Sequence, residues 1–114
     1  MWSKTHISVR KVGDVAIVDV TGSLTEGSEK EMDTAYQQAQ NEGLTKILIN
    51  FDRQSFITSA GFGLIVKLIW QARNSGHVLR VAHTSDQTRE LFDVIGLTQS
   101  IDVFDSEETA LAEF

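Results

Sequence analysis

The sequence contains no cysteine and no proline, and it has fewer basic than acidic side chains. The absence of cysteine excludes a disulfide scaffold, thiol catalysis and thiolate metal sites. The absence of proline excludes a proline-rich linker or tail. Sixteen acidic and ten basic side chains give a net charge of −6. A nucleic-acid binder would need a basic patch to neutralise phosphates, so we expect protein partners and no nucleic acid.

Long hydrophobic runs are also missing. The longest nearly apolar run, Phe62 to Trp70, contains Lys67 and is far too short to span a bilayer. The first residues, MWSKTHISVRK, lack the apolar core of a secretory signal. We therefore expect a cytoplasmic chain with no direct membrane insertion. We also expect a single domain over residues 1–114, because this length supports one core.

Strands and helices are predicted to alternate after an initial hairpin. Gly13-Asp14 separates two β-rich stretches, which is a typical hairpin signal. Apolar residues at helical spacing, behind small polar residues, indicate the helices. In chain order we predict strands over 6–12 and 15–22, a helix over 25–43, a strand over 46–51, a helix over 59–74, a strand over 77–82, a helix over 86–96, a strand over 100–104 and a helix over 107–114.

The order β-β-α-β-α-β-α-β-α predicts an α/β fold, with a small mixed sheet flanked by about four helices. The stretch KILINF (46–51) is continuously apolar, as is typical of a central strand buried on both faces. The helices are expected mainly on one face of the sheet. In the helix over 86–96, Leu91, Phe92 and Ile95 are predicted to form one apolar face, behind a cap at Ser85.

The stretch SFITSAGFGLIVKLIW (55–70) places a small polar cluster and two glycines before an apolar helix. Ser59 is the predicted N-cap of this helix, and Gly76 its stop. A dinucleotide fingerprint would need a third glycine, and a Walker loop would need Gly-Lys-Ser or Gly-Lys-Thr. The nucleophile elbow G-x-S-x-G lacks its first glycine here. The glycines are better explained by close packing of the helix against the sheet.

Catalytic and metal-binding patterns are not found either. His6, His77 and His83 fall in or beside predicted strands, and their spacing singles out none as a base. No H-x-x-x-H or H-E-x-x-H pair occurs. We predict no catalytic residues, no metal site and no cofactor, and therefore not an enzyme.

A modified serine is a further interpretation of Ser59. Backbone N–H groups at a helix start have no helical acceptor and can accommodate a phosphate. Phosphorylation adds about −1.5 to −2 units of charge, which would change the surface offered to a partner without unfolding the domain. From position alone, a capping serine and a regulated serine both remain open.

Four segments in order resemble the STAS domains, the anti-sigma factor antagonists of bacteria. The resemblance spans nearly the whole chain, and the matching spacing of the segments makes it specific as a set. The segments are VAIVDVTGSLT, KILINFDRQSFITSAGFGLIVKL, RELFDVIGL and IDVFDSEETALAEF; in the family they correspond to a strand with a G-x-L-D turn, a strand and helix with a D-S-S-G-L-G signature, an L-F-x-x-x-G-L segment, and the terminal strand and helix.

The resemblance implies a function. In this family the unphosphorylated domain binds a partner that is both anti-sigma factor and serine kinase, and so frees a sigma factor. The kinase phosphorylates the first serine of the signature, and a metal-dependent serine phosphatase resets it. Alignment of Gly61-Phe62-Gly63 with G-L-G places Ser59 on the modified serine, with Thr58 as the second choice. Phe62 is either core or a partner anchor.

The resemblance also implies a partner surface. Three residues depart from the signature: Thr58 and Thr25 replace aspartates, and Ala60 replaces the second serine. They motivate an alternative, a constitutive interaction module that is not phosphorylated, such as a signalling scaffold or the cytoplasmic subunit of a transport system. The implied surface comprises Gly22, Ser23, Leu24, Thr25, Thr58, Ser59, Ala60, Gly61, Phe62 and Gly63.

Overall fold

The chain begins with an antiparallel hairpin of β1 (His6–Val12) and β2 (Val15–Thr21). The strands pair from Val12 opposite Val15 to His6 opposite Thr21. Gly13 takes a φ of 60°, in the left-handed region that the first residue of a two-residue hairpin turn needs. The predicted hairpin is confirmed.

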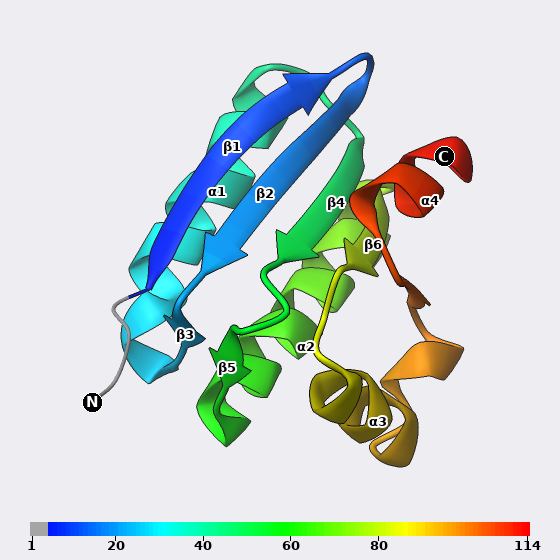
Figure 1. Cartoon of the computed structure of the whole chain (residues 1–114). Helices are drawn as coiled ribbons and strands as arrows, with labels where there is room; N and C mark the ends of the chain where they lie inside the picture. The colour runs from blue at the N-terminus through cyan, green and yellow to red at the C-terminus, as the bar shows by residue number, and fades with distance from the viewer. Residues whose placement is uncertain (1–4) are drawn as a thin grey trace.

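A computed structural model describes residues 5–114, and within them the main sheet has five strands in the order β1-β2-β4-β6-β7 (Figure 1). β2, β4, β6 and β7 run parallel to one another, so the predicted mixed sheet is confirmed. The remaining elements are β3 (Ser23–Leu24), η1 (Glu26–Ser28), α1 (Glu29–Asn41), β4 (Lys46–Phe51), β5 (Phe56–Ile57), α2 (Ser59–Ser75), β6 (Val78–Ala82), α3 (Asp86–Val94), η2 (Leu97–Gln99), β7 (Asp102–Phe104) and α4 (Glu107–Ala112).

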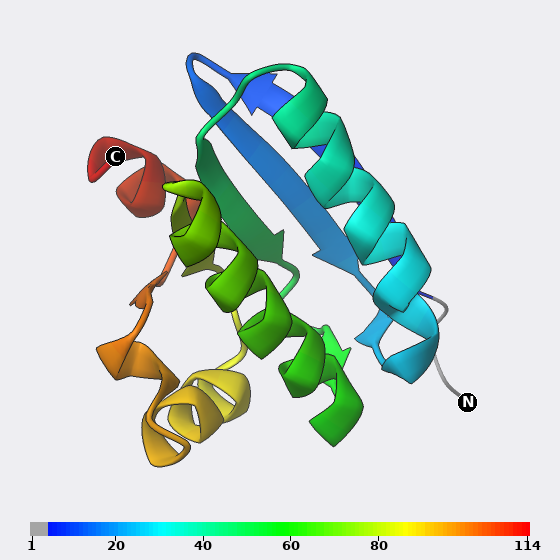
Figure 2. The same cartoon turned by 180° about the vertical axis from the view of Figure 1, so that it is seen from behind.

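The helices pack on both faces of the sheet. Figure 2 shows α1 and α2 side by side on one face, and Figure 1 shows α4 on the other. The alternation of β2 explains this, because Val18 and Val20 join the core under α1 and α2. Val15 and Ile17 point the other way and pack with Ala110 of α4. The larger core therefore lies on the α1 and α2 face.

Most predicted helix ends agree with the structure. Ser85 and Ser106 cap α3 and α4 by accepting from the amides of Thr88 and Thr109. Gly76 ends α2 in the left-handed conformation. The helix predicted over 25–43 begins as the 3₁₀ turn η1 and becomes α-helical at Glu29. Among residues 5–114, no helix has the length and apolar content needed to cross a lipid bilayer.

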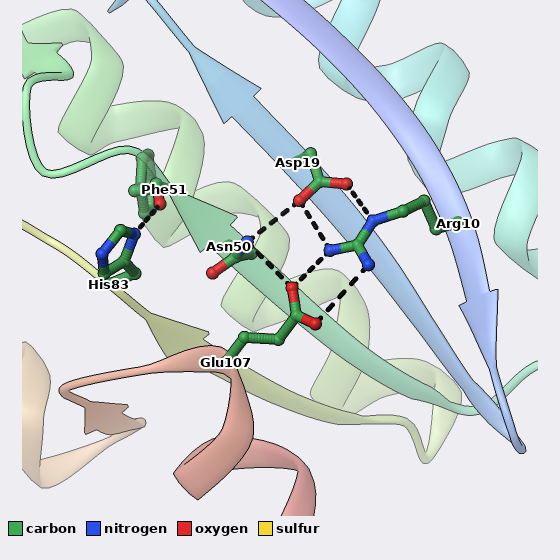
Figure 3. A network of polar contacts seen from close by, with 6 residues as sticks. All are labelled: Arg10, Asp19, Asn50, Phe51, His83 and Glu107. Atoms are coloured by element: carbon green, nitrogen blue, oxygen red, sulfur yellow. Dashed lines mark hydrogen bonds and ion pairs between the residues drawn. The ribbon is translucent and has the colours of Figure 1, made fainter.

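A polar cluster on the α4 face of the sheet holds α4 in place (Figure 3). Arg10 of β1 pairs with Asp19 of β2 and with Glu107, the first residue of α4. Asn50 of β4 donates to Asp19 Oδ1 over 2.9 Å and to Glu107 Oε1 over 3.2 Å. The cluster thereby joins three strands to a helix of only six residues.

Candidate partner-binding site

The two segments of the expected partner surface meet at the start of α2. β3 and β5 are two-residue strands that pair in parallel, with Ser23 opposite Phe56 and Leu24 opposite Ile57. They form a small separate sheet beyond the ends of β2 and β4. The pairing carries residues 22–25 alongside the first turn of α2 (Figure 1). The sequence pattern did not predict this sheet, because two residues are too short to show a strand period.

Thr58, and not Ser59, is the N-cap of α2. Thr58 Oγ1 accepts a hydrogen bond from the amide of Gly61 over 3.1 Å, and its backbone is extended. The same hydroxyl donates to the carbonyl of Leu24 over 3.3 Å. The prediction that Ser59 caps this helix was therefore wrong. Serine and threonine are both good N-caps, and the helix begins one residue earlier than expected from the serine.

Ser59 is left as an exposed residue at the first helical position. Within residues 5–114 its hydroxyl has no hydrogen-bond partner, since Thr58 supplies the cap. The amides of Ser59 and Ala60 likewise have no protein acceptor there. These N–H groups stand at the positive end of a 17-residue helix. The position suits an added anionic group.

Gly61 and Gly63 differ in what surrounds them. A Cβ on Gly61 would lie 2.9 Å from the carbonyl carbon of Leu24 and 3.0 Å from Ile57 Cγ2. Glycine is therefore required where α2 crosses β3 and β5. A Cβ on Gly63 would meet nothing within 4 Å, and this residue is exposed one helical turn after Ser59. The predicted close packing of both glycines holds for Gly61 alone.

Thr25 is the second departure from the family signature, and it too is an N-cap. Its hydroxyl accepts from the amide of Gly27 over 3.2 Å, and Ser28 Oγ accepts from the amide of Thr25 over 3.0 Å. A threonine at either departure, Thr25 or Thr58, keeps the cap oxygen that an aspartate would offer. The threonine lacks the negative charge of that aspartate. The site is therefore less acidic than the family signature implies.

Burial separates the expected surface residues into two groups. Ser59, Ala60 and Gly63 are exposed. Four others are half-buried: Gly22, Thr25, Thr58 and Phe62. Ser23, Leu24 and Gly61 are buried, and Leu24 has no exposed surface at all. The buried group can support a contact surface but cannot reach a partner.

Beside Ser59 lies an apolar groove between α2 and α3. It measures about 340 Å³ and is lined by Ile57, Ser59, Phe62, Leu91 and Ile95. We call it the α2–α3 groove. Phe62, which lines the groove, packs edge to face against the buried Phe92, with the two ring centroids 5.2 Å apart. Phe62 is thus part core and part surface.

The sequence pattern placed Leu91, Phe92 and Ile95 on one apolar face, and the structure shows that the three differ in burial. Of the predicted apolar face, only Phe92 is fully buried, whereas Leu91 and Ile95 are 47% and 52% exposed. Helical spacing indicates which residues share a face, but not how much of that face a neighbouring element covers. The unusual signal is the exposure of two large aliphatic side chains beside Ser59.

A family model described as the STAS domain matches residues 6–110. The match spans most of the 114 residues, and the mixed sheet with its flanking helices agrees with it. The chain belongs to the STAS domain family. This confirms the family resemblance seen in the sequence.

Two of the proteins similar to this chain carry the name anti-sigma factor antagonist. Over 108 residues the chain is 20% identical to a Bordetella bronchiseptica protein assigned the name anti-sigma factor antagonist BtrV, covering 95% of this chain and 93% of the relative. An anti-sigma factor antagonist from Mycobacterium paratuberculosis superimposes with a TM-score of 0.80 at 15% identity, covering 96% of this chain and 93% of that one. The Bacillus cell fate determinant SpoIIAA in its phosphorylated form gives 0.69 at 17%, covering 95% and 98%. The structural likeness establishes a shared fold.

Proposed function

We propose that this chain is an anti-sigma factor antagonist, one STAS domain over residues 1–114 that acts in the cytoplasm by binding and not by catalysis. Its unphosphorylated form binds an anti-sigma factor that is also a serine kinase. The anti-sigma factor then releases the sigma factor that it held. Phosphorylation of Ser59 ends the binding. A metal-dependent serine phosphatase restores the binding form.

The observation that carries this proposal is that two neighbouring hydroxyls, those of Thr58 and Ser59, differ in burial and in hydrogen bonding. Thr58 is half-buried, and its hydroxyl both accepts from Gly61 and donates to Leu24. Ser59 is exposed, and its hydroxyl has no partner within residues 5–114. A kinase can reach Ser59 without breaking the helix cap. To use Thr58, the kinase would have to remove both of its hydrogen bonds.

For the transfer of phosphate from ATP, this chain needs to supply only the free hydroxyl of Ser59. Ser59 Oγ attacks the γ-phosphorus of ATP held by the kinase, the bond to ADP breaks, and the hydroxyl proton passes to a base of the kinase. The product phosphate lies next to the amides of Ser59 and Ala60 at the N-terminus of α2. These groups favour an anion there, so the fold tolerates the modification.

The effect on the surface is large because the site begins with little charge. Thr25 and Thr58 carry no charge where the family signature has aspartates. Adding about −2 units at Ser59 therefore places a strong negative charge on the segment 58–63, whose own side chains carry none. A partner that fits the neutral surface is rejected, which gives a switch without a change of fold.

The test uses the serine-kinase anti-sigma factor of the chain's own host and isothermal titration calorimetry. Ser59→Ala is expected to bind this kinase as the wild-type chain does, whereas Ser59→Asp loses at least about tenfold in affinity. Thr58→Ser, which keeps the cap, is the matched control and should bind normally. Equal binding by the Ala and Asp variants would remove the switch from the proposal.

A second candidate function is a constitutive STAS interaction module, a signalling scaffold or the cytoplasmic subunit of a transport system. The observation that favours it is the loss of the signature's acidic groups at Thr25 and Thr58, because kinases recognise charge beside their target. It predicts that Ser59 is never phosphorylated in the host. It also predicts a stable complex that is the same in all growth conditions.

A further inference from the structure

β1 forms one edge of the main sheet, and its outer side has no strand beside it among residues 5–114 (Figure 1). The strand has seven residues, whereas β7 at the other edge has three. β1 pairs with β2 without a bulge and contains no proline. Short length, bulges and prolines are the usual features that keep an edge from pairing. The β1 edge lacks all three and is open to a further strand.

The hairpin determines which backbone groups point outward from β1. The turn between Val12 and Val15 has two residues, so these two form a hydrogen-bonded pair, and such pairs alternate along an antiparallel ladder. The backbone N–H and C=O groups of Ile7, Val9 and Lys11 therefore point away from β2. Within residues 5–114 these groups have no hydrogen-bond partner.

A hollow of about 250 Å³ lies along the same edge, between β1 and α1. We call it the β1–α1 groove. Its lining includes Ile7 and Val9 of β1 and Glu31, Ala35 and Gln38 of α1. The opposite side of α1 faces α2, where Lys67 pairs with Glu29 and Asp33. Helical spacing thus agrees with the placement of Glu31 on the β1 side.

The two ends of this edge carry opposite charges. Glu31, in the first turn of α1, lines the groove together with Ile7 near the start of β1. Lys11 lies four residues further along β1, about 14 Å from Ile7. Both charged side chains are exposed, and neither has an ion pair within the described residues 5–114. Lys30 also lines the groove, but the rotation of about 100° per residue turns it from Glu31 toward solvent.

We propose that two copies of this chain join through β1, in antiparallel pairing about a two-fold axis at Val9. In this register Val9 lies opposite Val9 of the second copy, and Ile7 lies opposite the second copy's Lys11. The outward N–H and C=O groups of all three residues then find partners, and the sheet continues from one copy into the other.

Charge complementarity identifies the occupant of the edge as a second copy. The two-fold axis brings Lys11 beside the second copy's Ile7, which is the end of the groove where the second copy's Glu31 lies. The same contact forms again on the other side of the axis. Each copy therefore supplies a cation for the other copy's carboxylate, so this surface is complementary to itself.

Other two-fold registers fit the edge less well. An axis at Arg10 or at Lys11 would set two like charges directly opposite each other, which destabilises an antiparallel pair. An axis at Ser8 would leave Lys11 with no β1 residue opposite it. The axis at Val9 places an apolar pair at the centre, and it sets Arg10 opposite an uncharged serine.

The proposed interface leaves the Ser59 surface free. α1 lies between the β1 edge and α2 in Figure 2, so a dimer would carry two separate Ser59 sites. The inference goes beyond the proposed function and does not depend on it. Each copy contributes one strand and one side of a helix, which is a small interface, so we expect a reversible dimer that forms as concentration rises.

The first experiment is sedimentation velocity on the full chain from about 1 μM to about 1 mM. The wild-type chain is expected to change from monomer to dimer over this range. Val9→Pro should weaken self-association about tenfold or more, because proline removes an N–H that points outward and leaves the β1–β2 ladder intact. Circular dichroism checks that this variant is folded. A wild-type chain that stays monomeric at about 1 mM would overturn the proposal.

Charge reversal tests the register without placing proline in the strand. Lys11→Glu and Glu31→Lys are each expected to weaken the dimer about fivefold, because each sets like charges together at two places. The double variant Lys11→Glu/Glu31→Lys should return to within about twofold of the wild-type chain. Glu90→Lys is the matched control for the charge change, since Glu90 is exposed on α3 and does not line the β1–α1 groove.

Two results would contradict the proposed interface. A dimer that Val9→Pro and both single charge variants leave unchanged would use a different surface, and the β1 pairing would be wrong. Weakening by the single charge variants with no recovery in the double variant would overturn the register at Val9. Neither result bears on the binding of the anti-sigma factor, which is measured separately.

Discussion

The amide of Thr58 donates to the carbonyl of Leu24 over 3.0 Å and joins two segments that are 34 residues apart in the chain. The Thr58 hydroxyl donates to the same oxygen over 3.3 Å while it caps α2. One residue thus starts α2 and fixes the segment 22–25, which contains β3, beside it. Ser59 is left free for a different role.

Thr58→Ala and Ser59→Ala are expected to differ in stability. Loss of the Thr58 cap should lower the free energy of unfolding by about 1 to 2 kcal/mol, because the amide of Gly61 then loses its acceptor. Ser59→Ala should change it by less than about 0.5 kcal/mol, since the Ser59 hydroxyl is exposed and unpaired. Urea titration followed by circular dichroism measures both. A larger loss of unfolding free energy for Ser59→Ala than for Thr58→Ala would indicate that Ser59, and not Thr58, caps α2.

Alanine at the two glycines of the signature should have opposite effects. Gly61→Ala would force its Cβ onto the Leu24 carbonyl, so we expect a loss of about 3 kcal/mol or failure to fold. Gly63→Ala meets open space in a helix and should raise the free energy of unfolding by about 0.5 to 1 kcal/mol. The same urea titration applies. Similar effects at both positions would contradict the asymmetric packing described for the site.

Much of the fold could be predicted from the sequence, because the main elements carry strong local signals. The Gly13-Asp14 turn, the apolar run 46–51 and the caps at Ser85 and Ser106 each depend on neighbours in the chain. β3 and β5 could not be predicted, since two-residue strands exist only through their pairing with each other. The packing of α4 depends on Arg10 and Glu107, which lie 97 residues apart.

The candidate site could be predicted only in part from the sequence. The serine and glycines drew attention to the start of α2, and the structure places residues 22–25 beside it. The cap could not be assigned to Thr58 from sequence, because both neighbouring hydroxyl residues suit the position. The groove could not be predicted at all. It depends on how far α3 stands from α2, which leaves Leu91 and Ile95 exposed.

The pH dependence of stability should include a contribution from Asp19. Burial raises the pKa of Asp19, but hydrogen bonds from Arg10 and Asn50, with the positive charge of Arg10, outweigh burial and hold this pKa below its usual range. A carboxyl whose pKa is lower in the folded state stabilises the fold above its unfolded pKa of about 3.9. That stabilisation is lost as the pH falls through the folded pKa.

Asp19→Asn should therefore lower the free energy of unfolding by about 1 kcal/mol at neutral pH, with the difference shrinking as the pH falls below about 3.9 and through the folded pKa. Denaturant titrations at several pH values measure this. Asp93→Asn is the control, because Asp93 is exposed and has no ion pair within residues 5–114. A difference for Asp19→Asn that grows as the pH falls would contradict the sign.

Ser59→Asp should leave the fold at least as stable as the wild-type chain. A carboxylate in the first turn of α2 interacts favourably with the helix dipole, so we expect a gain of about 0 to 1 kcal/mol. The melting temperature is the direct measure, with Ser75→Asp at the opposite end of α2 as the control expected to destabilise. A marked loss of stability in Ser59→Asp would mean that phosphate acts by unfolding.

The most direct test of the central claim is mass spectrometric mapping of phosphate on the chain isolated from its host under several growth conditions. The account predicts phosphate on Ser59, at an occupancy that changes with condition, and none on Thr58. An unmodified Ser59 in every condition, or phosphate on Thr58 alone, would contradict the account.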